Sequence, residues 1–360
     1  MISDRSGQAG FERLMDQEAD LEASIVVNQT LRLTAVARPV FLDSGVPDGT
    51  SAYRFGTAPV GAIFASQSTS GLAGEIQLST ENFGLRLGAS PTGFPVYNWL
   101  GGTRWRIGGG PITVLLNRDN VKDTLLSYAG ATDPASGVVW GGVMANTAAL
   151  QGNWGGAGNG LYGSMDYQLL QGKNVAQNYR IAGDAGAYWR IVSRPYGSLT
   201  IGANMFAMHY NKDLRYFTLG QGGYFSPQEY FLFNTPIRWV GNYKRDFEYS
   251  ISGSLGSQQF HEDTTPFFPN NPGLQGNPGP YYPSQTVTSV NYNFSFRGDY
   301  RLPGSWYLGA FVNFNNARDY AQQTFGFNVR YLFNNAPMTP ETPVPTIPDW
   351  RGFQPFRLPE

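Results

Sequence analysis

Long runs in which apolar and polar residues alternate one by one are the feature that most restricts the fold of this chain. Residues 324–333 show the pattern clearly, with one face made of Phe325, Phe327, Val329, Tyr331 and Phe333. Successive side chains of a β-strand point to opposite sides, so a period of two predicts strands with one apolar and one mostly polar face. The pattern recurs along most of the chain and predicts an all-β fold.

The alternation predicts about fifteen strands, many of them about 9 to 14 residues long. They span residues 20–28, 30–41, 71–79, 83–89, 101–107, 111–117, 138–150, 160–171, 180–192, 197–210, 228–240, 245–258, 286–302, 304–316 and 321–333. Strands in globular sheets average about 5 to 6 residues, whereas a tilted strand needs about 9 to 11 to cross a bilayer. A soluble sandwich would also alternate, but the length of the runs and the aromatic residues near their ends favour a transmembrane antiparallel up-and-down β-barrel.

The connections between the predicted strands are alternately short and long. Transmembrane barrels of bacteria have short turns on one side, long loops outside the cell and an even number of strands. The first predicted strand would descend from the long-loop side, so closure needs one more strand before it. We therefore expect about sixteen strands in the complete protein, with the first missing or curtailed here. Residues 1–19 would be the first extracellular loop and a remnant of that strand, residues 20–335 the barrel, and residues 336–360 a Pro-rich tail.

Composition excludes several classes of function. Charged residues make up 14% of the chain, well below the roughly 25% of an average soluble domain. The net charge of −1 argues against a nucleic-acid partner, since phosphate binding needs a basic surface. With no cysteine and two histidines, we expect no metal site and no cofactor. The start of the chain lacks the features of a signal peptide, so we expect a piece of a longer precursor.

Catalysis has little support in the sequence. The acidic pair Glu262 and Asp263 would suit glycosidase chemistry only if two carboxyls faced each other across a cleft, and in a polar loop such residues are usually solvated. No pattern of Ser, His and Asp residues in the sequence indicates a catalytic triad. We therefore expect a protein that is not an enzyme.

A sixteen-stranded barrel is too wide for side chains to fill, so the polar faces of the strands predict a water-filled lumen. Charges of both signs would offer hydrogen-bond partners to hydroxyl groups, and aromatic rings near the mouth would stack on sugars. The alternatives are charged residues that only pair with one another and aromatic residues that only pack the loops. The residues expected along the path of a substrate through the lumen or its mouth, called path residues below, are Tyr128, Trp140, Tyr162, Asp166, Asp184, Tyr188, Arg190, Arg215, Tyr216, Tyr224, Phe225, Arg238, Glu248, Arg297, Asp299, Arg318, Asp319, Tyr320 and Arg330.

A series of short motifs in a fixed order gives a further indication. They are residues 5–7 (RSG), 90–96 (SPTGFPV), 126–130 (LSYAG), 140–143 (WGGV), 172–176 (GKNVA), 214–218 (LRYFT), 222–228 (GGYFSPQ), 282–285 (YPSQ), 316–320 (NARDY) and 330–333 (RYLF). In these motifs the chain resembles the C-terminal barrel of the cellulose synthase operon protein C family over nearly its whole length.

The resemblance implies a sixteen-stranded channel in the bacterial outer membrane that exports cellulose or a modified glucan. It also implies an inner-membrane cellulose synthase complex as partner, reached through a periplasmic tetratricopeptide-repeat region that these 360 residues do not contain. Outer-membrane lipid and lipopolysaccharide would surround the barrel. A general porin and a surface adhesin barrel remain alternatives: a porin would pass many small solutes, and an adhesin would bind through its loops without conducting.

Overall fold

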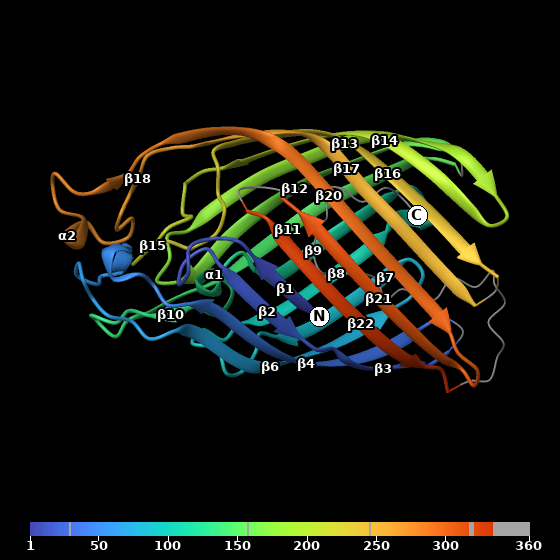
Figure 1. Ribbon diagram of the computed structural model, residues 1–360, viewed down its shortest axis with the longest axis horizontal. Helices are drawn as coiled ribbons and strands as arrows, with labels where there is room; N and C mark the ends of the chain where they lie inside the picture. The colour runs from blue at the N-terminus through green and yellow to red at the C-terminus, as the bar shows by residue number, and fades with distance from the viewer. Residues whose placement is uncertain (29, 157, 245, 317–319, 334–360) are drawn as a thin grey trace.

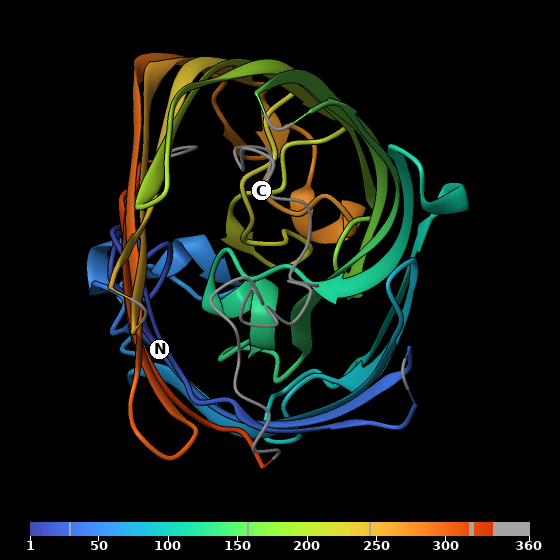
Figure 2. The ribbon, with the colours of Figure 1, turned by 90° about the vertical axis from the view of Figure 1, so that its right-hand side faces the viewer.

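The chain forms a closed antiparallel β-barrel, as the computed structural model shows for residues 1–28, 30–156, 158–244, 246–316 and 320–333 (Figures 1 and 2). Its wall consists of β1 (Ile2–Arg5), β2 (Leu14–Glu18), β3 (Leu21–Val26), β4 (Arg32–Gly45), β6 (Gln67–Ser79), β7 (Phe83–Ala89), β8 (Trp99–Arg106), β9 (Ile112–Asn120), β11 (Val139–Gly155), β12 (Asn159–Lys173), β13 (Asn178–Arg194), β14 (Gly197–Tyr210), β16 (Glu229–Tyr243), β17 (Phe247–Glu262), β20 (Gln285–Arg301), β21 (Trp306–Asn315) and β22 (Gln322–Tyr331).

Smaller elements lie in the connections between wall strands. These are η1 (Gly49–Arg54), β5 (Phe55–Gly56), η2 (Ile107–Gly109), α1 (Leu125–Ala129), β10 (Ala131–Thr132), β15 (Phe217–Thr218), β18 (Thr265–Pro266), α2 (Pro272–Gln275) and β19 (Tyr281–Tyr282). All of them except η2 belong to the long loops, which gather at the left-hand end of the barrel in Figure 1.

The short strand β1 closes the barrel. Its residue Arg5 pairs with Leu14 of β2 on one side, and Ile2 pairs with Phe325 of β22 on the other. β2 and β3 both pair with β4 and are successive parts of one wall strand. Among the described residues the wall therefore has sixteen strands, which confirms the predicted number, and the curtailed first strand is the four-residue β1.

Apolar side chains cover the outside of the barrel. Along β22, Phe327 is 81% exposed and Val329 57% exposed, while Asn328 between them turns inward. A soluble sandwich would bury such a face, so this outward apolar surface is that of a barrel in lipid. On the inner side, charged residues such as Arg86 and Asp166 are buried.

No helix among the described residues is long and apolar enough to cross a membrane.

The strands differ from expectation mainly at their long-loop ends. Leu14–Glu18 is a strand, although these residues lie in the segment expected to be the first loop. Its buried face carries Asp16 and Glu18, but its other face carries the exposed Gln17, so this short strand lacks the apolar outer face that reveals the other strands. β4, β6 and β17 each continue about four residues beyond their predicted ends on the long-loop side, to Gly45, from Gln67 and to Glu262. The expected Pro-rich tail, residues 336–360, lies outside the described residues.

Replacing Phe327 by Arg tests the outward face. The substitution places a charge where the strand meets lipid, and we expect it to lower the free energy of unfolding in lipid vesicles by about 2 to 4 kcal/mol. The matched control is Asn328→Arg, whose side chain would point into the lumen and should cost far less. Equal costs for the two variants would contradict the assignment of the faces.

Candidate functional site: the lumen and its loop cluster

The long loops fold inward across one end of the lumen. Figure 2, which looks into the barrel from its short-turn end, shows α1 and other loop segments inside the ring of strands. The two-residue strands β5 and β15 pair with each other in parallel, with Phe55 opposite Phe217. β5 belongs to the loop between β4 and β6, and β15 to the loop between β14 and β16, on the far side of the sixteen-stranded wall. The loops therefore join across the lumen.

An aromatic core holds the joined loops together. Trp140 is completely buried, and its ring centroid lies 5.2 Å from that of Phe55. Phe11 contacts both loops, with ring centroids 6.1 Å from Phe55 and 5.3 Å from Phe217. Phe225 packs at 5.1 Å on Phe260 of the wall. The loops thus form a packed core inside the barrel mouth, which we call the loop cluster.

The short helix α1 anchors the loop between β9 and β11 in this cluster. Thr124 caps the helix by accepting a hydrogen bond from the Ser127 amide, and its hydroxyl donates to the Gly223 carbonyl at 2.6 Å. The helix ends at Gly130, which has a positive φ of 80° and leaves no room for a Cβ atom beside Val96. A local cap and a local stop therefore place α1 against the loop between β14 and β16.

That loop, residues 211–228, carries a buried group of charges. Arg215 forms an ion pair with Glu262 of the wall at 2.7 Å. Asp213 accepts a hydrogen bond from the Arg215 amide at 3.1 Å, and its Oδ2 is buried without a hydrogen-bond partner among the described residues. Burial, together with the neighbouring Glu262 charge, raises the pKa of Asp213 to about 7. This carboxyl therefore titrates near neutral pH while the loop stays folded.

Stacked rings connect this loop to the one between β17 and β20. Tyr216 lies face to face with Tyr282 at a centroid distance of 3.5 Å, and Phe267 stacks on Tyr282 at 4.1 Å. Thr218 also donates a hydrogen bond to the Phe267 carbonyl at 2.5 Å. These contacts join the two loops to each other.

A cavity of about 240 Å³ lies where the loop cluster meets the start of the chain. The Arg5 guanidinium covers the Tyr320 ring at 4.1 Å, and two of its nitrogens are buried without a hydrogen-bond partner among the described residues. Glu12 and Asp123 supply acceptors in the same cavity. Donors, acceptors and an aromatic ring in one cavity are the groups that recognise a sugar.

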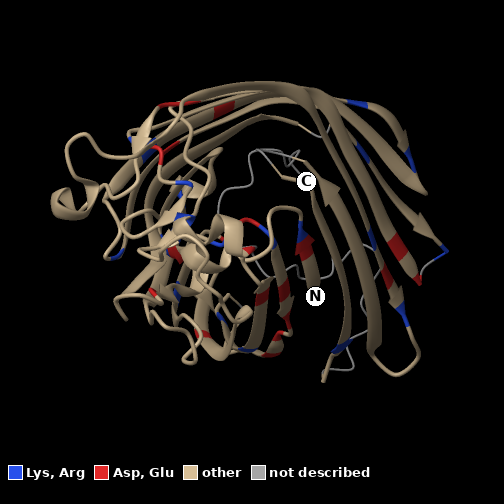
Figure 3. Cartoon of the chain, turned by 60° about the vertical axis from the view of Figure 1, so that its left-hand side comes forward, with Lys and Arg blue, Asp and Glu red and all other residues tan. Residues whose placement is uncertain are grey.

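Farther along the lumen, polar residues pair across neighbouring strands. Arg180 makes two hydrogen bonds to Asp166, at 2.8 and 2.6 Å, and both side chains are buried. Tyr162 donates to Asn204 at 2.9 Å, and Asp184 accepts from Ser164. Figure 3 shows basic and acidic residues interspersed on the strands as well as in the loop cluster. The wall is polar, and some of its charges, such as those of Arg180 and Asp166, form ion pairs within it.

The short-turn end of the lumen repeats this arrangement. Arg297 donates to Asp299 at 2.9 Å, Arg330 lies 3.6 Å from the same carboxylate, and Glu248 pairs in register with Asp299. Arg190 and Arg238 are half-buried on β13 and β16. Tyr188 donates a hydrogen bond to the Gly156 carbonyl at 3.2 Å.

The expected path residues thus divide into three groups. The first group lies on the wall and consists of Tyr162, Asp166, Asp184, Tyr188, Arg190, Arg238, Glu248, Arg297, Asp299 and Arg330. In the second group, Arg215 and Tyr320 line the cavity. In the third group, Tyr128, Trp140, Tyr216, Tyr224 and Phe225 pack against other side chains of the loop cluster, and Tyr224 and Phe225 also line the cavity. Arg318 and Asp319 lie outside the described residues.

A charged group that was not predicted from the sequence lies at the barrel seam, where β1 and β2 close the wall. Glu18 of β2 is buried and forms ion pairs with Lys122, from the loop before α1, at 2.5 Å and with Arg38 at 3.6 Å. Lys122 also lies 4.4 Å from the Tyr128 ring. Glu18 and Lys122 are 104 residues apart, so no local spacing could have paired them. Among the described residues, no three His, Asp or Glu side chains are grouped as a metal site requires.

Comparison with known proteins agrees with this architecture. The family model described as cellulose synthase operon protein C C-terminus matches residues 12–334. The chain belongs to this family. Cellulose synthase operon protein C of Pseudomonas fluorescens is 34% identical over 96% of the chain, and that of Escherichia coli K12 is 31% identical over 74%. The chain spans about a quarter of the length of these relatives, 27% and 24% respectively.

A solved structure shares the fold. A bacterial polysaccharide outer membrane secretin matches with a TM-score of 0.56 at 11% identity, over 92% of this chain and 97% of that one. At this identity the likeness shows the fold alone, and the fold is that of an outer-membrane β-barrel.

The Asp213 carboxyl predicts a pH dependence of the loop cluster. Its pKa is raised in the folded loop, so the stability that its proton contributes is fully present below about pH 4 and is lost as the pH rises through about 7. We expect the hydrogen-exchange protection factors of residues 211–228, which are corrected for the intrinsic pH dependence of exchange, to be lower at pH 8 than at pH 5. Asp213→Asn mimics the protonated form and should remove most of the difference. A variant that keeps the full pH dependence would contradict the assignment.

The pair of Arg180 and Asp166 predicts a stability effect. Arg180→Leu leaves a buried carboxylate without its cation, and we expect a loss of about 3 to 5 kcal/mol in denaturant unfolding. The double variant Asp166→Leu with Arg180→Leu removes both charges and should recover most of that loss. A single-variant cost below about 1 kcal/mol, as for an exposed pair, would show that water solvates this part of the wall.

Proposed function

We propose that this barrel is an outer-membrane conduit for a linear glucan, cellulose or a modified form of it, and that it performs no chemistry itself. The observation that carries the proposal is a polar lumen, wide enough for a channel, that interlocked loops cover at one end. Membership in the cellulose synthase operon protein C family supports cellulose as the polymer.

The paired charges of the lumen suit a passing sugar chain. A conduit must bind its cargo well enough to admit it but weakly enough to release it. Because Arg180 and Arg297 already pair with carboxylates, they offer glucan hydroxyls only their remaining hydrogen-bonding capacity. Many weak and similar contacts along the wall would keep the polymer hydrated without trapping it.

Export requires the loop cluster to open. The polymer would reach the cavity beside Arg5 and then meet the β5–β15 junction, which consists of two residues from each loop. So small a sheet is weak on its own, and packing around Phe55 and Trp140 supplies most of its stability. A polymer that advances from the periplasmic side would displace the loops. The aromatic rings that this exposes would then line the path of the polymer.

The proposed partners follow from the family. An inner-membrane cellulose synthase complex would drive the polymer, acting through a periplasmic tetratricopeptide-repeat region outside this chain. Outer-membrane lipid and lipopolysaccharide would surround the apolar outer face. We propose no cofactor for this conduction.

Ion conductance in planar bilayers tests the proposal. We expect the current to be blocked by linear cello-oligosaccharides, more strongly as their length increases, and not by branched dextrins of similar mass. Indifference to both sugars would indicate a general porin. The absence of any opening under all voltages and pH values would indicate an adhesin and would reject the conduit.

A disulfide across the loop junction tests the gate. The chain has no cysteine, so Phe55→Cys with Phe217→Cys creates a single possible bond between residues paired in register. Neighbouring strands lie about 4.8 Å apart, within the Cα separation that a disulfide tolerates. We expect the oxidised barrel to stay at its lowest conductance and the reduced barrel to regain openings that cello-oligosaccharides block.

The two single-cysteine variants are the controls for lost aromatic packing. They should open in both redox states. Full opening and sugar block in the oxidised double variant would show that the polymer path bypasses this junction.

A further inference from the structure

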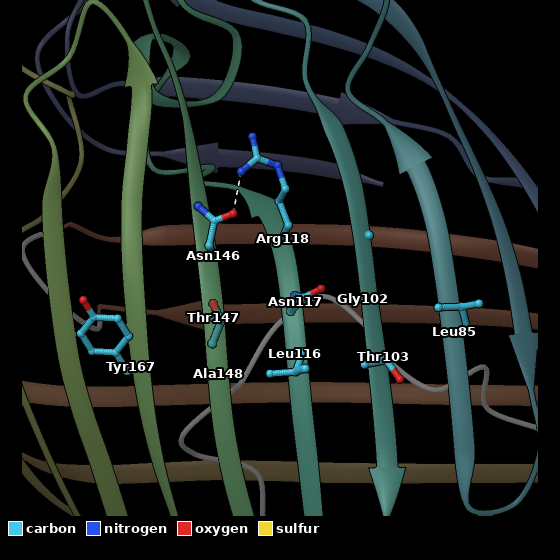
Figure 4. Close-up of a pocket in the computed structure, with 11 residues that line it drawn as sticks. Leu85, Gly102, Thr103, Leu116, Asn117, Arg118, Asn146, Thr147, Ala148 and Tyr167 are labelled. Carbon is cyan, nitrogen blue, oxygen red and sulfur yellow. Dashed lines mark hydrogen bonds between the residues drawn. The ribbon is translucent and has the colours of Figure 1, made fainter.

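A groove lies on the outer face of the barrel, across β7, β8, β9, β11 and β12 (Figure 4). Its volume is about 460 Å³. Leu116 and Tyr167, which line it, are 51% and 48% exposed, as expected of side chains that point away from the lumen. The groove therefore opens toward the lipid and is separate from the conduit.

Small residues between larger ones create the groove. Gly101 and Ala148 lie among Leu85, Leu116 and Tyr167. A Cβ atom on Gly101 would meet only the Arg86 carbonyl and a Leu87 methyl group, both at 3.4 Å, so the backbone does not require glycine there. The depression is shallow and mostly apolar, and it extends over several strands, which suits a hydrocarbon chain lying on the wall.

A cation stands at the end of the groove nearer the long loops. Arg118 is close to the end of β9, and its side chain reaches Asn146, whose Oδ1 accepts from Nη1 at 2.5 Å (Figure 4). Its Nε donates to the Trp99 carbonyl at 3.2 Å. Among the described residues Arg118 forms no ion pair, whereas Arg86, on the inner side of the same wall, pairs with two carboxylates. The outward guanidinium is held in place without being neutralised.

Other polar groups continue this end of the groove. Asn146 also donates to the Leu169 carbonyl at 3.1 Å and lies 3.4 Å from the Gln171 side chain. Lys173 follows two residues later on β12, on the same face as Tyr167, and is exposed. A positive rim above an apolar groove is complementary to a lipid with an anionic headgroup.

We propose that the groove binds one acyl chain of a phosphate-bearing glycolipid of the outer leaflet, and that Arg118 binds its phosphate. The choice of leaflet rests on the proposed function, because the long loops then face outside the cell. A guanidinium presents several donors in a fork that matches phosphate oxygens, and the hydrogen bond to Asn146 orients that fork. The site would fix one lipid against the wall that supports α1 and its loop.

Native mass spectrometry of the detergent-solubilised barrel tests the site. The probes are bis-phosphorylated lipid A, the same lipid with its phosphates removed, and phosphatidylglycerol, each at equal concentration. We expect one bis-phosphorylated lipid A to remain on each barrel and the other two lipids to be lost at least tenfold more readily.

Two variants separate the parts of the site. Arg118→Gln should reduce retention of bis-phosphorylated lipid A about tenfold, the loss expected for one charge-assisted contact. Gly101→Val fills the groove and should also reduce retention, although the phosphate contact remains possible. Arg106→Gln is the matched control, since Arg106 is exposed at the short-turn end of the adjoining strand β8.

Equal retention by Arg118→Gln and wild type would overturn the proposal. So would equal retention of the dephosphorylated lipid or of phosphatidylglycerol, which would indicate an unspecific lipid shell. The sugar block of conductance, measured in phosphatidylcholine bilayers, should be the same for all three variants and wild type. Loss of that block in wild type would reject the conduit while leaving the lipid result standing.

Discussion

Closure of the backbone hydrogen-bond ladder is the constraint on which the rest of this structure depends. In lipid, an unpaired backbone N–H or C=O group has no water to bond, so a sheet that spans the membrane must leave no open edge. Here β1 supplies the closing pairs to β2 and β22. The same region carries the ion pairs of Glu18, which connect the seam to the loop before α1. The wall and the loop cluster are therefore coupled where the barrel closes.

A wall of sixteen strands encloses more space than its own side chains fill, so its contents decide its function. Loops joined through β5 and β15 occupy one end, and polar residues, several of them in ion pairs, line the remainder. Both features favour a conduit that the loops close at rest and that opens when they move apart. An open porin would not need an aromatic core between loops from opposite walls, and an adhesin would not need a polar lumen.

The wall was predictable from the sequence because its physics is local. Alternation with a period of two identifies each strand from its own residues, and strands such as β14 were predicted with their observed bounds. Leu14–Glu18 was not predicted because it is only five residues long and its exposed face carries Gln17, so it lacks the apolar outer face of the other strands. Alternation also predicted that Asp166 faces inward, where it is buried.

The loop cluster was not predictable, because its contacts join residues far apart in the chain. Thr124 and Gly223 are 99 residues apart, and Phe55 and Phe217 come from opposite walls. Sequence alone could not tell an aromatic residue that binds sugar from one that packs loops, and Trp140 shows the difficulty, since it is completely buried. The outward Arg118 lay just beyond the predicted end of its strand, so its face was not assigned.

The most direct test of the account is an electron cryomicroscopy structure of the barrel in lipid nanodiscs with a long cello-oligosaccharide added. The account predicts sugar density along the lumen past Asp166 and Arg180, with the loops that carry β5 and β15 moved apart. Sugar density confined to the outer surface of the loops, above an empty lumen and an unchanged β5–β15 junction, would contradict it.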